Sequence, residues 1–327
     1  RGAEDEAKRR RHNSRKFKRC MELVPLVFLL SVGETMIAGT RIDCRPAGWS
    51  YSLILPSFDP RNFSSSGKAL RHFCGYEYPL GLKPSYFAGN PMSAPIYIDV
   101  GANYVLSLLP FLSRGWTVLA FEPSRQNADV IRAAVDLNPD IPGRLHLIEA
   151  AASNTNSDNT PFFTPLSGRL DNAALSEHAA RLNVGGKVNR VWVRSVRPDD
   201  ALKAMDLHMR NVRYIKCDTQ GHEVNALQGM SEIVRWAHPD LRLQVEYSEP
   251  LQLAQGHTPT ELLRLMSSMG LAARCRGRCI VTAEELITAS GDRSCMKNVK
   301  LQRASQSCSP SLKSMDSGKR PLRNVMN

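Results

Sequence analysis

Short apolar runs alternate with segments of helical spacing between residues 96 and 282. The runs predict strands at Ile96–Val100, Thr117–Phe121, Leu145–Ala150, Val191–Val196, Val212–Cys217 and Leu241–Tyr247, followed by a last strand or hairpin within 271–282. The helical segments are Tyr104–Leu112, Ser124–Leu137, Glu223–Trp236 and a helix opening at Thr258-Pro259-Thr260-Glu261 with a capping-box pattern. This alternation predicts an α/β fold, in which a mainly parallel sheet carries helices on both faces.

The segments around this pattern are less regular. Residues 40–93 are rich in Pro, Ser, Gly and aromatic residues without a sustained period, and we predict an irregular leader there. The domain itself is predicted to span 94–290, interrupted by a polar, loop-like insertion at 152–190 over one edge of the sheet. The leader and the insertion are expected to shape the pocket of a substrate.

The net charge of +12 lies at the two ends of the chain. Residues 1–20 hold nine Lys/Arg and three acids, residues 297–327 hold seven and one, and the remainder is close to neutral. We therefore predict basic disordered tails at 1–20 and 291–327. A neutral body argues against nucleic acid as the main partner.

An apolar segment follows the first basic tail. Residues 21–39 include LVPLVFLLSVG, which fits a signal-peptide core, a short membrane anchor or a first helix that packs on the domain. The first two alternatives predict a secretory or membrane-associated protein, with membrane contact through 21–39, and the third leaves a cytoplasmic location open. The eight cysteines do not decide between these compartments. Cys275 and Cys279 lack a second Cys/His pair of metal spacing, so no metal site is predicted.

Polar residues follow most of the predicted strands. They are Asp99, Gly101 and Asn103 at the end of the first strand, Glu122 after the second, Glu149–Ser153 at the end of the third, Asp218, His222 and Glu223 after Cys217, and Glu246 and Glu249 at the end of Leu241–Tyr247. Parallel sheets bind ligands outside the carboxyl ends of their strands. Acids that recur at successive strand ends therefore predict one shared cleft.

The spacing of Gly101 and Glu122 indicates the kind of ligand. A glycine followed by an acid about 20 residues later is typical of sites that hold an adenosine ribose. The G-x-G-x-x-G pattern and the P-loop lysine pattern, which bind phosphates, are both missing from the sequence. The ligand is thus expected to carry adenosine without phosphates, and the cationic sulfonium of S-adenosylmethionine suits a cleft lined with acids. A nicotinamide-dependent oxidoreductase is disfavoured by the missing glycines.

Four motifs in this order resemble the FkbM family of S-adenosylmethionine-dependent methyltransferases. They are D-V-G-A-N at 99–103, A-F-E-P-S at 120–124, I-K-C-D-T-Q-G-H-E at 215–223 with L-Q-G at 227–229, and Q-V-E-Y at 244–247. The resemblance implies a class I, Rossmann-like methyltransferase fold and methylation of a hydroxyl on a sugar or secondary metabolite. It also implies that Asp99, Gly101 and Asn103 line the methionine end of the cofactor, Glu122 the ribose, and Ala150, Ala151 and Ala152 the adenine.

The same resemblance places Asp218, His222 and Glu223 near the transferred methyl group or the acceptor, a small molecule or glycan. His222 is the first choice for a base because a neutral imidazole can take the hydroxyl proton, although it could instead cap or pack the next helix. Asp218 could hold the acceptor or be the base itself. Glu223 could instead complement the helix dipole, and Glu246 could contact the acceptor or pair with an arginine.

Two positions depart from the family pattern. Val105 stands where the family usually has a second glycine, and Val196-Arg197-Pro198-Asp199 replaces the family's Leu-Asp pair. A branched side chain at Val105 could crowd the cofactor. The alternative function is therefore a non-catalytic, methyltransferase-like binding protein.

Overall fold

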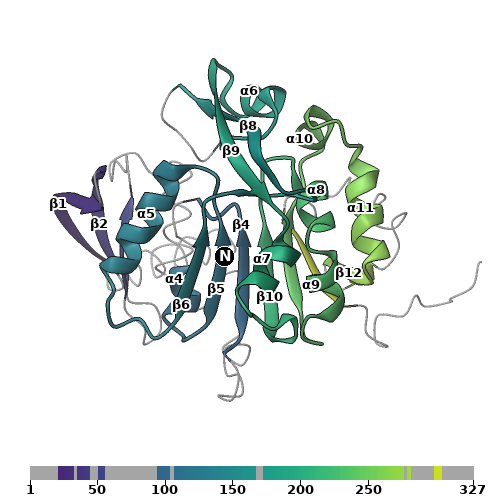
Figure 1. Ribbon diagram of the computed structural model, residues 1–327, viewed down its shortest axis with the longest axis horizontal. Coiled ribbons are helices and arrows are strands. Elements are labelled where there is room, and N and C mark those ends of the chain that lie inside the picture. The colour runs from purple at the N-terminus through teal and green to yellow at the C-terminus, as the bar shows by residue number, and fades with distance from the viewer. Residues whose placement is uncertain are drawn as a thin grey trace, which may run out of the picture.

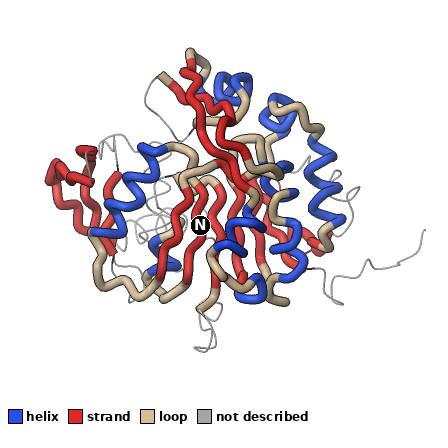
Figure 2. The backbone as a smooth tube through the Cα atoms, viewed as in Figure 1, coloured by secondary structure: helices blue, strands red, loops and turns tan. Residues whose placement is uncertain are grey.

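The computed structural model describes residues 21–32, 35–44, 51–55, 94–103, 107–166, 172–275, 278–280 and 298–303. These residues form a central sheet flanked by helices, a smaller sheet above it, and a strand group to one side (Figures 1 and 2). Val105 lies outside the described residues, as do 1–20, most of 40–93 and 304–327.

The central sheet has eight strands in the order β13-β12-β14-β11-β10-β4-β5-β6. Their bounds are β4 Ile96–Val100, β5 Thr117–Phe121, β6 Arg144–Ile148, β10 Val212–Cys217, β11 Arg242–Glu246, β12 Leu271–Cys275, β13 Arg278–Ile280 and β14 Asn298–Arg303. Strands β6, β5, β4, β10 and β11 pair in parallel, whereas β14 runs antiparallel to both β11 and β12. The expected mainly parallel sheet is confirmed, and its strand order is that of the class I methyltransferase fold.

Helices cover this sheet on both faces. They are α4 Leu109–Leu112, α5 Arg125–Asp136, α7 Pro198–Ala204, α8 Glu223–Gln228, α9 Ser231–Trp236, α10 Glu249–Ala254, α11 Pro259–Ser268 and the 3-10 turn η3 Met209–Asn211. The Ser124 side chain caps α5, and the capping box of Thr258 and Glu261 opens α11, as the sequence predicts. Of the helix predicted over Tyr104–Leu112, only the last turn forms among the described residues.

The predicted helix Glu223–Trp236 is divided into α8 and α9. The break lies at Gly229 and Met230, where the chain passes close to Ser153. A Cβ atom on Gly229 would lie 1.9 Å from the Ser153 carbonyl oxygen, so only glycine allows this approach.

The two faces of the central strands carry different side chains. Ile98, Ile215 and Leu243 belong to a large aliphatic core on one face, which continues into α8, α9 and α11. On the other face Tyr97 stacks on Phe111 with ring centroids 4.1 Å apart. Asp99 follows Tyr97 by two residues on β4, so its side chain lies on the aromatic face, level with Lys216 of β10.

The insertion predicted as a loop at 152–190 is largely regular structure. Strands β7 Ala151–Ala152, β9 Val188–Val196 and β8 Ser157–Pro165 form a second sheet in that order, and helix α6 Glu177–Val184 packs against β8 (Figure 1). The prediction fails because Asn, Asp and Pro within β8 are depleted in strands, while its packing is supplied by the neighbouring β9.

Both ends of the described chain also differ from the predictions. Residues 21–39 do not form a helix: β1 Met21–Val32 and β2 Thr35–Cys44 pair as antiparallel strands, and β3 Tyr51–Leu55 extends them into the predicted irregular leader. The predicted disordered tail 291–327 contains strand β14, in which Val299 and Leu301 are buried. The strand was not predicted because its two apolar residues alternate with basic and polar residues over only six positions. No helix in the described part of the chain has the length and apolar character needed to cross a membrane.

Candidate active site

The chain reverses its direction of travel across the sheet between β4 and β10. After β4 it builds β5 and β6 on one side, and it then returns to place β10 on the other side of β4. The carboxyl ends of β4 and β10 are therefore followed by loops that diverge, which is where open α/β sheets bind ligands. At this point Gly101 has φ +78°, and a Cβ atom on it would lie 2.0 Å from the Asp218 carbonyl oxygen.

A cleft opens above these two strand ends. It contains about 700 Å³ of space outside protein atoms, the open mouth included. The cleft is lined by the carboxyl ends of β4, β5 and β10 with the segments that follow them, and by the insertion. The lining residues are Val100, Gly101, Asn103, Phe121, Glu122, Pro123, Asn127, Ala151, Ala152, Phe162, Ala173, Leu175, Lys216, Asp218, Thr219, Gln220 and His222. The expectation that several strand ends share one cleft is confirmed by this lining.

Glu122 stands at the end of β5 with its carboxylate held by three amides. The backbone N–H groups of Asn103 and Ser124 donate to it at 2.8 and 3.0 Å, and the Asn127 Nδ2 lies 3.3 Å from Oε1. Burial raises the pKa of Glu122 to about 7, and the two backbone donors oppose that shift. Asn127 Oδ1 is buried without a hydrogen-bond partner on the same wall.

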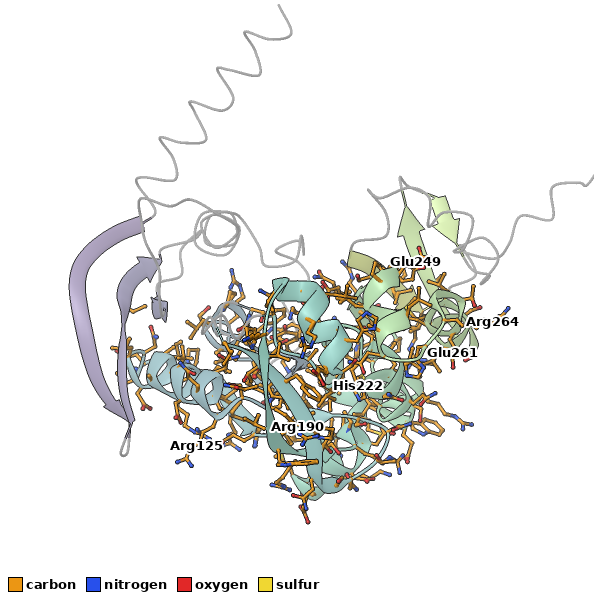
Figure 3. The ribbon with its side chains drawn as sticks, turned by 90° about the horizontal axis from the view of Figure 1, so that it is seen from above. Arg125, Arg190, His222, Glu249, Glu261 and Arg264 are labelled. Atoms are coloured by element: carbon orange, nitrogen blue, oxygen red, sulfur yellow. The ribbon has the colours of Figure 1, made fainter. Side chains whose placement is uncertain are left out.

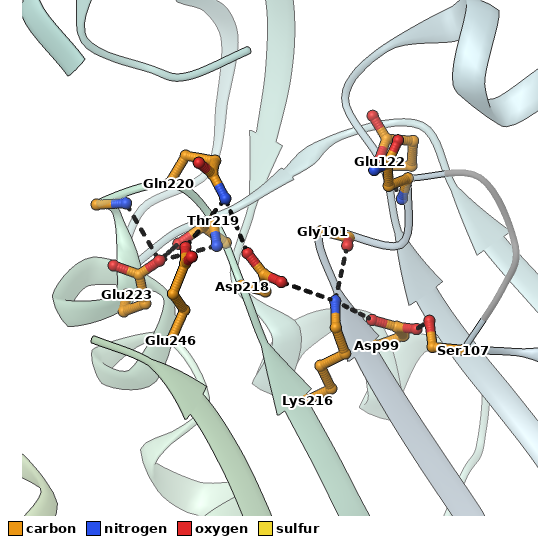
Figure 4. Close-up of polar contacts among 12 residues, drawn as sticks. Asp99, Gly101, Ser107, Glu122, Lys216, Asp218, Thr219, Gln220, Glu223 and Glu246 are labelled. Atoms are coloured by element: carbon orange, nitrogen blue, oxygen red, sulfur yellow. Dashed lines mark hydrogen bonds and ion pairs between the residues drawn. The ribbon is translucent and has the colours of Figure 1, made fainter. Parts of the chain in front are cut away.

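Asp99 lies beneath the cleft and does not line it. The side chain is fully buried, and its Oδ2 accepts hydrogen bonds from the Tyr97 hydroxyl at 2.7 Å and from the Ser107 hydroxyl. The Lys216 Nζ lies 3.5 Å from the other oxygen (Figure 4). The prediction that Asp99 lines the methionine end of the cofactor is thus corrected, because a carboxylate with these three partners faces the protein interior.

Lys216 connects the two strand ends. Its ammonium donates to the Gly101 carbonyl oxygen at 3.2 Å and lies 3.5 Å from the carboxylates of both Asp99 and Asp218. Burial alone would lower the pKa of Lys216, but these carboxylates raise it, so the side chain stays charged. Sequence reasoning missed Lys216, although its position two residues before Asp218 on a strand places both on one face.

Asp218 presents a partly exposed carboxylate to the cleft. About 31% of its side chain is exposed, toward the cleft that it lines. The Gln220 Nε2 donates to Asp218 Oδ1 and to Glu246 Oε2, both at 3.0 Å (Figure 4). Burial favours the neutral form of Asp218, yet Lys216 and the hydrogen bonds hold the pKa of this carboxyl below its ordinary value. Glu246 is not among the residues that line the cleft, and the Gln220 amide lies between it and Asp218.

Glu223 organises the loop that carries Asp218. Its Oε1 accepts hydrogen bonds from the backbone N–H groups of Thr219 at 2.8 Å and Gly221 at 3.1 Å, and Gln252 of α10 donates to its other oxygen. The side chain is 1% exposed and does not line the cleft. The predicted catalytic role of Glu223 is therefore corrected to a positioning role.

His222 lines the cleft but lacks the properties of a base. The Asn225 Nδ2, which can only donate, lies 3.2 Å from His222 Nδ1, so the ring proton is on Nε2, 3.2 Å from the Ser153 hydroxyl. Burial and the nearby His257 lower the pKa of His222 to about 4. The His222 side chain is buried, with 8% exposed, and Figure 3 labels it near the centre of the view. The predicted role of His222 as base is corrected to that of a neutral donor that holds Ser153.

The fold and this site define a class I methyltransferase. A family model described as the Methyltransferase FkbM domain matches residues 99–271, which is more than half of the chain. The chain therefore belongs to the FkbM methyltransferase family, whose cofactor is S-adenosylmethionine, as the four motifs indicate. A search of curated proteins finds no match to the chain.

Solved structures with a similar arrangement include two methyltransferases and a protein named Trm5b. Methyltransferase FkbM from Methylobacillus flagellatus KT is 15% identical with a TM-score of 0.35, and the match covers 66% of this chain and 47% of that one. Magnesium protoporphyrin IX methyltransferase (ChlM) from Synechocystis PCC 6803, with bound SAM, is 10% identical with a TM-score of 0.35, covering 74% and 93%. Trm5b from Pyrococcus abyssi is 9% identical with a TM-score of 0.31, covering 83% and 60%.

The residues of the cleft fit S-adenosylmethionine. Gly101 lets the backbone approach Asp218 where any Cβ would collide, and Glu122 offers carboxylate oxygens to a ribose. The unpartnered Asn127 Oδ1 can accept from an N–H or O–H donor of a ligand. Lys216 is the only cation among the described lining residues, and its ammonium is already shared by carboxylates, so none of these residues offers a free cation to a phosphate.

Proposed function

We propose that the protein is an S-adenosylmethionine-dependent O-methyltransferase acting on a neutral hydroxyl of a sugar or secondary metabolite. The observation that carries this proposal is the Asp218 carboxylate, which is ionised, 31% exposed and lines the same cleft as Glu122. A carboxylate in this state can accept a hydrogen bond from an acceptor hydroxyl and take its proton.

The cofactor has its place on the β4–β5 side of the cleft. Glu122 would hold the ribose, Gly101 and Asn103 would border the methionine end, and Ala151 with Ala152 would lie against the adenine. When bound, S-adenosylmethionine supplies a methyl group that the acceptor oxygen takes as that oxygen loses its proton and the sulfonium becomes a neutral thioether. The protein residues bind and align the two molecules and keep water out of the space between them.

The acceptor has its place between Asp218 and the insertion. Phe162, Ala173 and Leu175 of the insertion line the cleft and would provide apolar surface for a sugar ring or a hydrocarbon skeleton. The Lys216 ammonium already contacts Asp99, Gly101 and Asp218. Among the described residues that line the cleft, no other cationic side chain is available to bind an anionic acceptor. A carboxylate or phosphate at this position would face Asp218 without compensation, which favours a neutral hydroxyl.

Transfer of a radiolabelled methyl group to a panel of acceptors tests this function. The wild-type protein is expected to label hydroxyl-bearing sugars or metabolites in preference to carboxylates and phosphates. Asp218→Asn should lower turnover at least about 100-fold, because the variant cannot take the hydroxyl proton. Asp158→Asn is the matched control, since the side chain of Asp158 is 92% exposed on the insertion, and it should retain turnover.

Two results would contradict the proposal. Turnover at the wild-type level in Asp218→Asn would remove the assigned base. A wild-type protein that binds S-adenosylmethionine but labels none of the hydroxyl acceptors would favour the non-catalytic binding protein instead.

A further inference from the structure

Two carboxylates meet at the acceptor side of the cleft with one amide between them. The Gln220 Nε2 donates one proton to Asp218 Oδ1 and the other to Glu246 Oε2, each at 3.0 Å. The backbone of Gln220 has φ +57°, a conformation that non-glycine residues rarely adopt, and the Asn183 Nδ2 of α6 donates to the side-chain Oε1 of Gln220 at 2.9 Å. Three side chains thus fix the orientation of this amide, and such fixed strained residues are frequent at functional sites.

The surroundings of the two carboxylates are not equivalent. Lys216 lies 3.5 Å from Asp218, whereas no cationic side chain among the described residues contacts Glu246. Asp218 lines the cleft and Glu246 does not. The negative charge of Asp218 favours the protonated form of the neighbouring Glu246, so that the pair carries one proton.

We propose that Glu246 holds this proton and acts as a positioning residue, so that Glu246 and Gln220 together keep Asp218 as the single ionised carboxylate facing the acceptor. This inference rests on the proposed function, because it assigns the roles of the pair at the acceptor site. In this arrangement Asp218 receives two donors from behind and one cation from the side, and its exposed edge is left for the acceptor hydroxyl.

The charges around the pair support the same assignment. Burial raises the pKa of Glu246 well above its ordinary value, and the nearby charges of Asp218 and Glu223 raise it further. Lys216 acts in the opposite direction on both carboxyls but touches only Asp218. Asp99 and Glu223 are the other acidic groups that face this network, from β4 and α8, and each is bonded to donors of its own.

Infrared difference spectroscopy tests where the proton resides without requiring turnover. At about pH 8, above the pKa of Glu122, the wild-type protein should show the carbonyl stretching band of a buried protonated carboxylic acid. Glu246→Gln should lose this band, and Asp218→Asn should retain it. Glu249→Gln, which alters an exposed carboxylate three residues later, is the control and should leave the band unchanged.

Turnover of the two isosteric variants is the second test. A glutamine amide can donate to Asp218 as a protonated glutamate does, so Glu246→Gln should stay within about threefold of the wild-type kcat, a change below that of one hydrogen bond. It should also remove the fall in activity on the alkaline side of the pH profile, where wild-type Glu246 loses its proton. Glu246→Ala should lose at least about tenfold in kcat, because Asp218 then lacks its partner.

The opposite pattern would overturn the inference. If Asp218→Asn keeps turnover and Glu246→Gln abolishes it, or if the infrared band disappears with Asp218→Asn, the proton resides on Asp218. The two tests also separate this inference from the proposed function. A protein that transfers no methyl group but loses the band only in Glu246→Gln would contradict the function while upholding the placement of the proton.

Discussion

The two halves of the cleft use acidic residues in different ways. On the β4–β5 side, Asp99 is fully buried and Glu122 is 3% exposed, and protein donors bond to both carboxylates. On the β10–β11 side, Asp218 is partly exposed, and its neighbour Glu246 shares a single amide donor with it. In the first half, hydrogen bonds from the protein fix the positions of the carboxylates. In the second half, the Asp218 carboxylate remains accessible to a ligand.

This difference follows from what each half must do. A cofactor of constant structure is bound best by a preorganised wall, since donors and acceptors fixed in advance need not reorganise on binding. A reacting hydroxyl needs a group that can take its proton, which requires an accessible base and a defined protonation state. The link between the halves is Lys216, which contacts Asp99, Gly101 and Asp218.

The largest effect is expected from Gly101→Ala, which disturbs the contact between the ends of β4 and β10, where the two halves of the cleft meet. The new Cβ would lie 2.0 Å from the Asp218 carbonyl oxygen at a φ of +78°, so β4 and β10 must separate at their carboxyl ends. We expect a loss of at least about 2 kcal/mol in the free energy of unfolding and loss of cofactor binding. Urea denaturation and calorimetric titration measure the two quantities.

Gly115→Ala is the matched control for this change. Gly115 has φ +77° but nothing within 4 Å of its added Cβ, so it bears the backbone strain without the collision. It should cost about 1 kcal/mol and leave cofactor affinity intact. Equal losses in both variants would mean that the close approach of Gly101 to Asp218 is not needed.

An intermediate effect is expected from pH acting on Glu122. The pKa of this group is about 7 in the free protein, and a ribose is bound by the ionised carboxylate. Affinity for S-adenosylmethionine should therefore rise as pH increases through about 7 and level off above it, with up to about tenfold change per pH unit below. Glu122→Gln should show a flat profile, and a wild-type profile that is equally flat would exclude Glu122 from the ribose site.

The stability of the free protein should change in the opposite direction. Because the folded pKa of Glu122 is raised above its unfolded value of about 4.5, the folded state binds the proton more tightly. This contribution to stability is complete below about pH 4.5 and is lost as pH rises through about 7. The free energy of unfolding of wild type relative to Glu122→Gln should fall over that window in urea titrations.

The smallest effect is expected for His222→Gln. The ring donates to Ser153 and carries no charge near neutral pH, so its loss removes about one hydrogen bond. We expect a decrease in kcat of less than about tenfold, with an unchanged pH profile. A larger loss, together with loss of the acidic limb of the pH profile, would restore His222 as the base.

The sequence predicted the elements that meet at the cleft but not the partners of its acids. Strands β4 and β5 are buried along their whole length and β10 at four of its six positions, so they appear as largely apolar runs whose ends could be located closely. The position of Asp99 below the cleft depends on Ser107 and Lys216, which come from other segments. Such partners are determined by the register between strands, which no pattern along a single strand contains.

Other elements were missed for different reasons. Strand β14 is short and is interrupted by basic residues, and the position between β11 and β12 that buries Val299 and Leu301 is a tertiary effect. The sheet of the insertion depends on pairing between β8 and β9, which lie far apart in the sequence. Gln220 resembled an ordinary turn residue, and its role became apparent only once β10 and β11 placed two carboxylates beside it.

The most direct test of the division between the two halves is calorimetric titration of S-adenosylmethionine into the wild type, Glu122→Ala and Asp218→Asn. The account predicts a single site in the wild type, at least tenfold weaker binding in Glu122→Ala, about 1.4 kcal/mol, and affinity within about threefold of wild type in Asp218→Asn. Undiminished binding in Glu122→Ala, or an equal loss in both variants, would contradict it.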